Sequence, residues 1–521
     1  MKLLTNLTPA LRAFCAAAAI AAFGIAAPAG AQQAEELRVL KLWELQTLDL
    51  ETAGFDLRSL GVIESLVATT EDGQMVPALA EAWTVSDDGL TWDFTIRDNA
   101  VFHDGTAVTG EAVAASYIAL KDNARLLKDM PIGSVSSEGQ TVTFTLTEPF
   151  GSFLPYLLDP TGPVLAPASF ADGAVTVPVA TGPFAINMAA TELPRSVMLR
   201  RHDGYWGDLA QFEQARVDFV GNPETRVNIA LAGEADVIPE IPASSVARIN
   251  ASGVATIEQV VMPRHVMLML NAGEPQFETP DLRRAMSLAI DRRAIAAAVF
   301  GDPGLAATQY FPPVAGAWHL DTVQELTYDP GAANAVLDAA GWVRGEDGIR
   351  TKDGVRFAGS IRTFPERAYL PVICEILQQQ FAEIGYELTL DVGDWSRIPE
   401  GQSDGSLDLG LGIRTMMNVT PDPIVRLQED FASDAVPPGA TGATNWSNQE
   451  IRDAVTAYLA SSDEEARAGY RETILQVLHD ELPVIPIVWT AENFAISTRV
   501  GGFRANPLVQ DWRLNLIGPA E

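Results

Sequence analysis

The stretch Pro77-Ala-Leu-Ala-Glu-Ala-Trp83 continues through Ser86-Asp-Asp-Gly-Leu-Thr-Trp92 to Phe102-His-Asp-Gly105, and it carries the most information about the fold. Ser86–Gly89 has the composition of a turn, and every second residue from Trp92 to Ile96 is apolar. Such alternation places apolar side chains on one face of a strand and polar ones on the other. The stretch therefore predicts a β-hairpin with one buried face.

Predicted strands and helices alternate along the rest of the chain. Alternating patterns and turn residues predict strands at 37–43, 141–146, 196–200, 217–220, 235–238, 386–392 and 483–489. Helical periodicity and capping residues predict helices at 109–120, 224–232, 280–301, 330–341, 372–384 and 464–478, and a capping box at Ser447–Glu450. No internal repeat or long Gly/Ser linker separates them. The alternation favours an α/β layer architecture whose domains share more than one chain crossing.

The N-terminal segment has the pattern of an export signal. Arg12 provides a basic flank, Ala13–Ala27 is apolar, and Ala29-Gly-Ala31 supplies an A-x-A exit. About 15 apolar residues fall short of the roughly 20 that a membrane-spanning helix needs. The pattern predicts a signal peptide over residues 1–31, cleaved after Ala31, and therefore a periplasmic protein.

Composition limits the classes of partner. The 521 residues include 68 acidic and 35 basic side chains, for a formal net charge of −33. Such acidity argues against nucleic acid and anionic membranes as partners, and we interpret it as a source of solubility. With 47% hydrophobic residues the chain can bury large cores, and the length of about 490 residues after the predicted signal peptide implies two or three domains. Cys374 is the only cysteine after the predicted signal peptide, so no disulfide forms within the mature chain.

Motifs of catalysis and of cofactor binding are absent from the sequence. It contains no G-x-S-x-G, H-E-x-x-H, G-x-x-x-x-G-K-[ST] or G-x-G-x-x-G pattern. The five histidines show no spacing that suggests a shared metal ion. The sequence thus predicts a binding protein with no catalytic residue, no cofactor and no bound metal.

Several blocks together resemble one known family. Beyond the opening stretch they are Gly182-Pro-Phe184, Asp203-Gly-Tyr-Trp-Gly207, Thr225–Asp236, Leu270-Asn271, Arg283–Arg292, Tyr328-Asp-Pro330 and Ala339-Ala-Gly-Trp342. Each block alone is a weak signal, but the set is specific and spans essentially the whole mature chain. It resembles the family 5 extracytoplasmic solute-binding proteins, the peptide- and nickel-type receptors of bacterial ABC importers.

The resemblance implies an α/β, bilobed periplasmic-binding-protein type II fold with an additional accessory lobe. By analogy, lobe I takes residues 32–58, 176–268 and 486–521, the accessory lobe 59–175, and lobe II 269–485. Shared crossings would form a hinge, and a ligand that contacts both lobes would select the closed state. A membrane permease and its ATPase would then recognise closure of a monomeric receptor.

One segment resembles a ligand-binding segment of dipeptide-binding relatives. Pro365-Glu-Arg367-Ala-Tyr369-Leu-Pro371 is similar to their P-x-x-R-x-Y-x-P, one residue shorter before the arginine. The resemblance implies that Arg367, with Tyr369 beside it, binds the carboxylate of a ligand. A planar guanidinium suits this task because it bonds a carboxylate bidentately and stays charged when desolvated. The alternative is a surface arginine that caps a loop.

The segment that would bind a peptide's ammonium departs from the family pattern. Asn418-Val-Thr-Pro-Asp422-Pro423 retains the trailing Asp-Pro of a D-N-G-D-P-like segment, whereas the amine-binding position falls near Val419. Either another acidic residue substitutes, or the ligand is not an ordinary peptide. Nickel-type relatives hold a metal chelate with arginines and a histidine. Arg125 resembles one of those arginines, with a solvated helix end as the alternative, and the second arginine position falls in Asp159–Pro163, which has none. Arg414-Thr415 resembles the Arg-Thr before their Asp-Pro segment.

Aromatic and methionine side chains complete the predicted site. Large, adaptable side chains suit a pocket with loose geometric demands, although core packing explains them equally well. The candidates are Trp43, Trp395, Met416, Met417 and Trp446. Together these features predict a receptor for a peptide or peptide-like carboxylate solute. The alternatives are a receptor for nickel or a metallophore chelate, a secreted hydrolase with an unrecognised site, and a sensor or chaperone-like protein.

Overall fold

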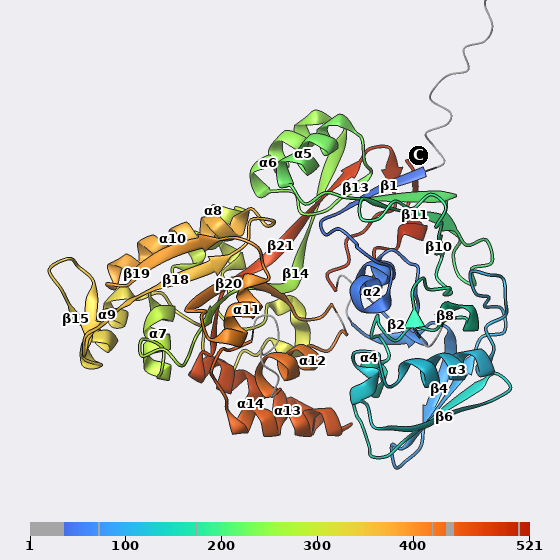
Figure 1. Cartoon of the computed structure of the whole chain (residues 1–521), viewed down its shortest axis with the longest axis horizontal. Coiled ribbons are helices and arrows are strands. Elements are labelled where there is room, and N and C mark those ends of the chain that lie inside the picture. Colours follow the sequence, from blue (N-terminus) through green and yellow to red (C-terminus); the bar gives the residue numbers. More distant parts are fainter. Residues whose placement is uncertain are drawn as a thin grey trace, which may run out of the picture.

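A computed structural model describes residues 36–70, 73–171, 174–418, 420–433, 442–508 and 511–520. The predicted signal peptide and its cleavage site lie outside this range. Figure 1 shows a long sheet that runs across the molecule, with a separate small sheet beside it. Within the described residues, none of the helices has both the length and the apolar character that crossing a bilayer requires.

The long sheet has ten strands in the order β10-β11-β12-β1-β13-β21-β14-β20-β18-β19. Their bounds are β1 Glu36–Lys41, β10 Phe184–Ile186, β11 Ser196–Arg201, β12 Gln214–Phe219, β13 Val237–Ile238, β14 Ala255–Leu270, β18 Ala358–Thr363, β19 Glu387–Val392, β20 Leu409–Thr415 and β21 Val484–Ser497. In one half, β1 is parallel to β12 and β13. In the other half, β18 is parallel to β19 and β20.

Two long antiparallel strands, β14 and β21, join the halves of the sheet. Their first stretch of pairing, from Ala255–Ser497 to Val261–Ala491, lies beside β13. After a register shift at Met262–Arg264, pairing resumes at His265–Trp489 and continues beside β20. A β-bulge bends a strand locally and weakens its ladder. The shift therefore interrupts the β14–β21 ladder at the junction of the two halves of the sheet.

We call the half with β1 and β10–β13 lobe I and the half with β18–β20 lobe II. Helices α5 (Pro223–Ala232) and α6 (Ala243–Ser252) belong to lobe I, where they pack on apolar residues such as Ile238 and Ala495. Lobe II contains α7 Pro280–Leu288, α8 Arg292–Phe300, α9 Pro330–Ala339, α10 Tyr369–Glu383, α11 Arg397–Asp404, α12 Ile424–Leu427, α13 Gln449–Ala460 and α14 Glu464–Glu481. The residue boundaries proposed for the lobes from the sequence stay a prediction.

The accessory lobe is built on the small sheet, ordered β4-β5-β7-β6. Its elements are β4 Ala80–Val85, β5 Thr91–Ile96, β6 Ile132–Glu138, β7 Thr141–Leu146, α3 Gly110–Leu120 and α4 Phe153–Tyr156. The predicted hairpin is present as β4 and β5, and Thr109 caps α3 by accepting a hydrogen bond from the Ala112 amide. Phe94 and Ile96 of β5 are buried. The opening stretch of sequence thus builds the accessory lobe.

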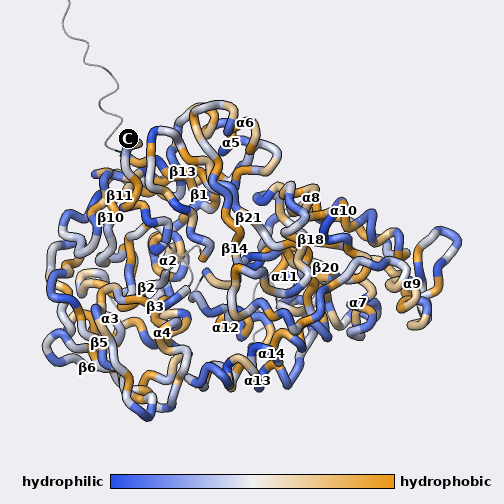
Figure 2. Tube along the Cα trace, turned by 180° about the vertical axis from the view of Figure 1, so that it is seen from behind, coloured by the Kyte–Doolittle hydropathy of each residue, from blue (hydrophilic) through white to orange (hydrophobic). Residues whose placement is uncertain are grey.

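Smaller elements complete the chain. Helix α2 spans Leu50–Ser59, and Gln428–Ala432 forms a π-helical turn after α12. The remaining strands are β2 Val67–Thr69, β3 Met75–Pro77, β8 Phe170–Ala171, β9 Ala174–Val175, β15 Val343–Arg344, β16 Arg350–Lys352, β17 Val355–Arg356, β22 Val500–Gly501 and β23 Gly518–Pro519. Figure 2 shows hydrophilic residues mainly along the outer loops and apolar stretches through the interior.

Two local predictions are wrong. The single helix predicted over 280–301 is two helices, α7 and α8, because the Asp291 side chain accepts from the Ala294 amide and starts a new helix. Buried Arg292 donates to the carbonyls of Ser287 and Pro486, which ties the break to the core. At α13 the capping residue is Asn448, which accepts from the Glu450 and Ile451 amides, rather than Ser447.

Candidate functional site

Two sets of parallel strands, β1 and β13 in lobe I and β18, β19 and β20 in lobe II, run in opposite directions, and their carboxyl ends face each other between the lobes. Trp43 follows β1, Glu240 follows β13, Arg367 follows β18, Trp395 follows β19 and Asn418 follows β20. In open α/β sheets, ligands bind outside the carboxyl ends of the strands, where the strand order switches direction. The topology therefore places the candidate site here, on loops from both lobes.

A cavity of about 220 Å³ lies between three of the predicted site residues. Trp43 of lobe I lines it, with Arg367 and Trp395 of lobe II. Both indoles are unusually exposed for tryptophan, at 46% for Trp43 and 43% for Trp395. Isolated exposed apolar residues are common, but two such side chains that line one cavity from opposite lobes make this cavity a candidate binding site.

A second, larger cavity of about 470 Å³ also borders Arg367. Lobe I contributes Arg226 and Glu240, and lobe II contributes Tyr369 and the apolar end of α8 around Phe300. The hydroxyl of Tyr369 is buried and has no hydrogen-bond partner among the described residues. Most of this lining is apolar, with a few charged groups at one side, which is the usual character of a small-molecule site.

Arg367 forms an ion pair across the gap. Its Nη1 donates to Oε1 of Glu240, so a lobe II guanidinium contacts a lobe I carboxylate. Arg367 is only 8% exposed, and its Nε has no hydrogen-bond partner among the described residues. The arginine is thus placed where the sequence predicts ligand binding, but a carboxylate of the protein already occupies one of its donors.

Three more charged residues surround this pair. Nη2 of Arg264 lies 3.1 Å from Oε1 of Glu240 and 3.3 Å from Oε2 of Glu492. Nη2 of Arg226 donates to the backbone carbonyl of Glu240 at 3.0 Å. Burial, together with the nearby charge of Arg367, lowers the pKa of Arg226 to about 10, which leaves it protonated at neutral pH. We call Arg226, Glu240, Arg264, Arg367 and Glu492 the Arg367 cluster.

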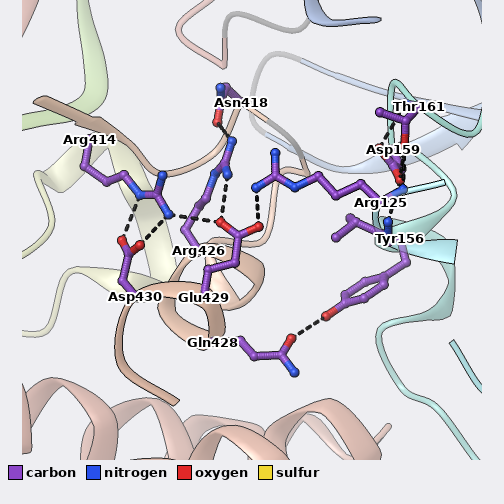
Figure 3. Close-up of polar contacts among 11 residues, drawn as sticks. Arg125, Tyr156, Asp159, Thr161, Arg414, Asn418, Arg426, Gln428, Glu429 and Asp430 are labelled. Carbon is purple, nitrogen blue, oxygen red and sulfur yellow. Dashed lines mark hydrogen bonds and ion pairs between the residues drawn. The ribbon is translucent and has the colours of Figure 1, made fainter. Parts of the chain in front are cut away.

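A second set of charges joins the accessory lobe to lobe II (Figure 3). Glu429, on the π-helical turn, accepts hydrogen bonds from Arg125 of the accessory lobe and, in lobe II, from Arg414 at 3.0 Å and Arg426 at 2.8 Å. Arg414 also forms a bidentate ion pair with Asp430, in which its Nε donates to Oδ2 at 2.8 Å and its Nη2 to Oδ1 at 2.5 Å. We call Arg125, Arg414, Arg426, Glu429 and Asp430 the Glu429 cluster.

The three arginines affect the pKa of Glu429 more than burial does. Burial alone would raise the pKa of this carboxyl, but Arg426, Arg125 and Arg414 together lower it to about 2. Burial lowers the pKa of Arg426 to about 9. Arg125, which resembles a chelate-binding arginine of the nickel-type relatives, and Arg414 therefore both contact a carboxylate of the chain itself.

The other predicted site residues lie away from the two cavities. Met416 is fully buried, and Met417 is 7% exposed. Oδ1 of Asn418 accepts from Arg426 at 3.1 Å, and its backbone carbonyl accepts from Arg58. Buried Asp422 accepts from Tyr458 at 2.9 Å and pairs with Arg467 at 2.7 Å. Val419, near the predicted amine-binding position, lies outside the described residues.

The sequence did not single out Glu240, Arg226 or Arg264 as site residues. Arg226 belongs to a block that resembles the family but has no assigned binding role there. Glu240 lies in Val237-Ile-Pro-Glu-Ile241, which contains no recognisable motif. Glu240 does have a left-handed backbone, with φ of 54°. Non-glycine residues rarely adopt this conformation, and they do so most often at functional sites. Such a conformation leaves no trace in a single sequence.

Among the described residues, no three or more His, Cys, Asp or Glu side chains are grouped in a way suited to a metal ion. The site therefore offers charged side chains of both signs, two tryptophans and two cavities that both border Arg367. A profile of the bacterial extracellular solute-binding proteins, family 5 Middle, matches residues 74–434. The chain belongs to this family. It binds a small solute for an ABC transporter outside the cytoplasm, and it is not an enzyme. The hydrolase considered from the sequence is therefore set aside.

Characterised relatives of this family 5 protein bind different solutes. The chain is 27% identical over 481 residues to the nickel-binding periplasmic protein of Escherichia coli K12, covering 88% of this chain and 90% of the relative. It is 25% identical over 458 residues to the glutathione-binding protein GsiB of Escherichia coli O1:K1, covering 85% and 86%. Both the nickel-type and the peptide-type branches of the family are therefore represented among the relatives.

The solved structure of NikA from Brucella suis in complex with Fe(III)-EDTA has the same fold. It superimposes with a TM-score of 0.81 over 92% of this chain and 99% of that one, at 23% sequence identity. This likeness confirms the predicted α/β solute-binding-protein fold. At this identity it carries no information about the solute.

Proposed function

We propose that this receptor binds a peptide or peptide-like carboxylate solute between its lobes, with the carboxylate on Arg367. The solute would be delivered to an inner-membrane permease with its ATPase by a monomeric receptor. One observation carries the proposal: the Arg367 cluster holds three arginines but only two carboxylates, and it borders both cavities. A buried charge without a counterion is costly, so an anionic ligand is the simplest complement.

All three arginines of the Arg367 cluster are buried. Arg226 is 1% exposed, Arg264 3% and Arg367 8%, so bulk water does little to screen their charge. Glu240 and Glu492 balance two of the three positive charges. Arg226 makes no ion pair of its own in the described structure; its nitrogens contact backbone carbonyls of Val220, Gly221 and Glu240. A single carboxylate would make the cluster neutral.

The geometry at Arg367 favours a carboxylate over a compact anion. A guanidinium presents a planar fork of donors, and the Nε of Arg367 is free of hydrogen bonds to the described residues. Trp43 and Trp395 flank the same cavity and offer flat apolar surfaces for the rest of the solute. The cavities of about 220 and 470 Å³ are of a size that suits a small peptide.

Tryptophan fluorescence tests the ligand class. Because Trp43 and Trp395 line the cavity, we expect a saturable change on titration with trialanine or glutathione. Trialanine amide, which lacks only the terminal carboxylate, is the matched ligand control and should bind at least tenfold more weakly. A response to a nickel–histidine chelate and to none of the peptides would replace the proposal with the nickel alternative.

Arg367→Gln tests the residue assignment. The variant should weaken trialanine binding by about 2 kcal/mol, roughly thirtyfold, because a charge-assisted contact is lost. Arg356→Gln is the matched control, since Arg356 is an exposed arginine on β17 at the outer end of lobe II. Isothermal titration calorimetry of the three proteins gives the comparison. Equal affinity in all three would remove Arg367 from the site.

A further inference from the structure

We infer that Glu240 is a built-in substitute for the ligand's carboxylate and sets which solutes can bind. In the structure, the Glu240 carboxylate accepts a hydrogen bond from Arg367, the residue that would bind the solute's carboxylate under the proposed function. The inference rests on that function. Without solute, the contact holds lobe I to lobe II; a solute must displace Glu240 from Arg367 to bind there. Glu240 thereby acts as a specificity-determining residue.

Lobe I holds Glu240 in place for this contact. Nη2 of Arg226 binds the backbone carbonyl of Glu240 at 3.0 Å, and Nη2 of Arg264 lies 3.1 Å from its carboxylate. Its left-handed backbone, with φ of 54°, is unfavourable for a glutamate and persists only where the surroundings impose it. Arg367 follows β18 of lobe II, so its contact with Glu240 spans the two lobes.

Displacement of Glu240 leaves its charge paired. Once a solute takes Arg367, the Glu240 carboxylate keeps Arg264 at 3.1 Å, so release does not strand a buried charge. When Arg367 loses its ion pair with Glu240, a solute carboxylate restores an ion pair, whereas a neutral amide does not. Glu240 therefore excludes neutral analogues by competition, and its own removal should make carboxylates bind more tightly.

Glu240→Gln tests this inference against a matched variant, Glu492→Gln. Both substitutions remove one negative charge from the Arg367 cluster, but only Glu240 contacts Arg367. With trialanine and N-acetylalanine as probes in calorimetry, we expect Glu240→Gln to bind about tenfold more tightly than wild type, the scale of one charge-assisted hydrogen bond. Glu492→Gln changes the charge of the cluster without touching Arg367, so its gain should come from charge alone and should not exceed about threefold. Equal gains in both variants, or no gain in Glu240→Gln, overturn the inference.

Small-angle X-ray scattering without ligand gives a second measurement that needs no probe. Glu240→Gln should increase the radius of gyration because the lobes lose a contact, and Glu492→Gln should not. If the probes bind neither wild type nor Glu240→Gln, the proposed function is wrong. If the radius of gyration of Glu240→Gln equals that of wild type, the inference about Glu240 is wrong, whatever the probes do. Circular dichroism checks folding, and Glu240→Asn replaces a misfolded glutamine variant, since asparagine tolerates the left-handed backbone.

Discussion

The Arg367 cluster and the Glu429 cluster have the same composition, three arginines and two carboxylates, yet they differ in where the unbalanced positive charge lies. In the Glu429 cluster, the buried pair Arg414 and Arg426 is balanced by the two acids, and the third arginine, Arg125, has a side chain that is 35% exposed. In the Arg367 cluster, all three arginines are buried, and the extra charge borders two cavities.

Under the proposed function, this difference separates a structural cluster from the candidate binding cluster. Water solvates the extra charge at Arg125, so the Glu429 cluster needs no further anion to be stable. Water does not reach the extra charge of the Arg367 cluster to the same degree, because all three of its arginines are buried. Composition alone would not distinguish the two clusters; burial and the neighbouring cavities do.

Glu429→Gln should have the largest effect on stability. The substitution leaves Arg426, which is 5% exposed, without a carboxylate partner and removes the contact to Arg125. Loss of one partner from a buried ion pair costs about 3 kcal/mol, because the remaining charge stays desolvated. Urea denaturation followed by circular dichroism measures the change in unfolding free energy.

The exposed Glu346, in the hairpin loop of lobe II, supplies the control. Glu346→Gln should change the unfolding free energy by less than about 0.5 kcal/mol, as surface substitutions usually do. Trialanine affinity should stay near the wild-type value in both variants, because Glu429 belongs to the structural cluster. A large loss of affinity in Glu429→Gln with little loss of stability would reverse the roles of the two clusters.

Much of the fold follows from local patterns in the sequence. Asp329 before Pro330 correctly predicts the start of α9, and the alternation at Trp92–Ile96 correctly predicts β5. The pattern fails for β14, whose sixteen residues include Pro263 and an uninterrupted buried run, so no alternation marks it. It also fails at Asp291, where a tertiary contact of Arg292 splits one periodic stretch into two helices.

The candidate site was predictable only where one residue carries a local signal. Arg367 lies in a segment that resembles a known ligand-binding segment, and Trp43 and Trp395 are large side chains at strand ends. Glu240 lies 127 positions from Arg367, and no local pattern links the two. Asp422 shows that a local match can also mislead. Its Asp-Pro motif matches a ligand-binding segment, yet in the structure Asp422 is buried and pairs with Arg467. Pairing between distant charges requires the folded structure.

Glu64 offers a half-buried carboxylate with no arginine partner among the described residues, and this contrast with Glu429 predicts opposite pH dependence. Burial raises the pKa of Glu64 to about 7, although Tyr205 and Trp206 donate hydrogen bonds to it at 3.0 and 3.2 Å. The folded protein therefore keeps a proton on Glu64 that the unfolded chain, with a pKa near 4.5, releases. The unfolding free energy consequently falls as pH rises through this window.

The effect at Glu64 should be about 1 to 2 kcal/mol, reduced because the side chain is partly accessible to water. Urea denaturation of wild type and Glu64→Gln between pH 4.5 and 7.5 measures it, with wild type losing stability relative to the variant as pH rises. The pKa of Glu429 is about 2 in the folded protein and near 4.5 in the unfolded chain, so its charge stabilises the fold above pH 4.5. This stabilisation decreases only as the pH falls from about 4.5 to about 2. Parallel profiles for wild type and Glu64→Gln would contradict the assignment.

Arg125→Gln should have the smallest effect and tests the comparison most directly. Its guanidinium is about a third exposed, so its contact with Glu429 should contribute only about 0.5 kcal/mol and should weaken further in high salt. Lys121→Gln is the control, because Lys121 pairs with Asp122 on the surface of the same lobe. Urea denaturation at low and high salt should show a small difference for Arg125→Gln that vanishes at high salt. If Arg125→Gln instead costs as much as Glu429→Gln at every salt concentration, its charge is not solvated. The Glu429 cluster would then hold an unbalanced buried charge as well, and it would become a second candidate site for an anionic solute.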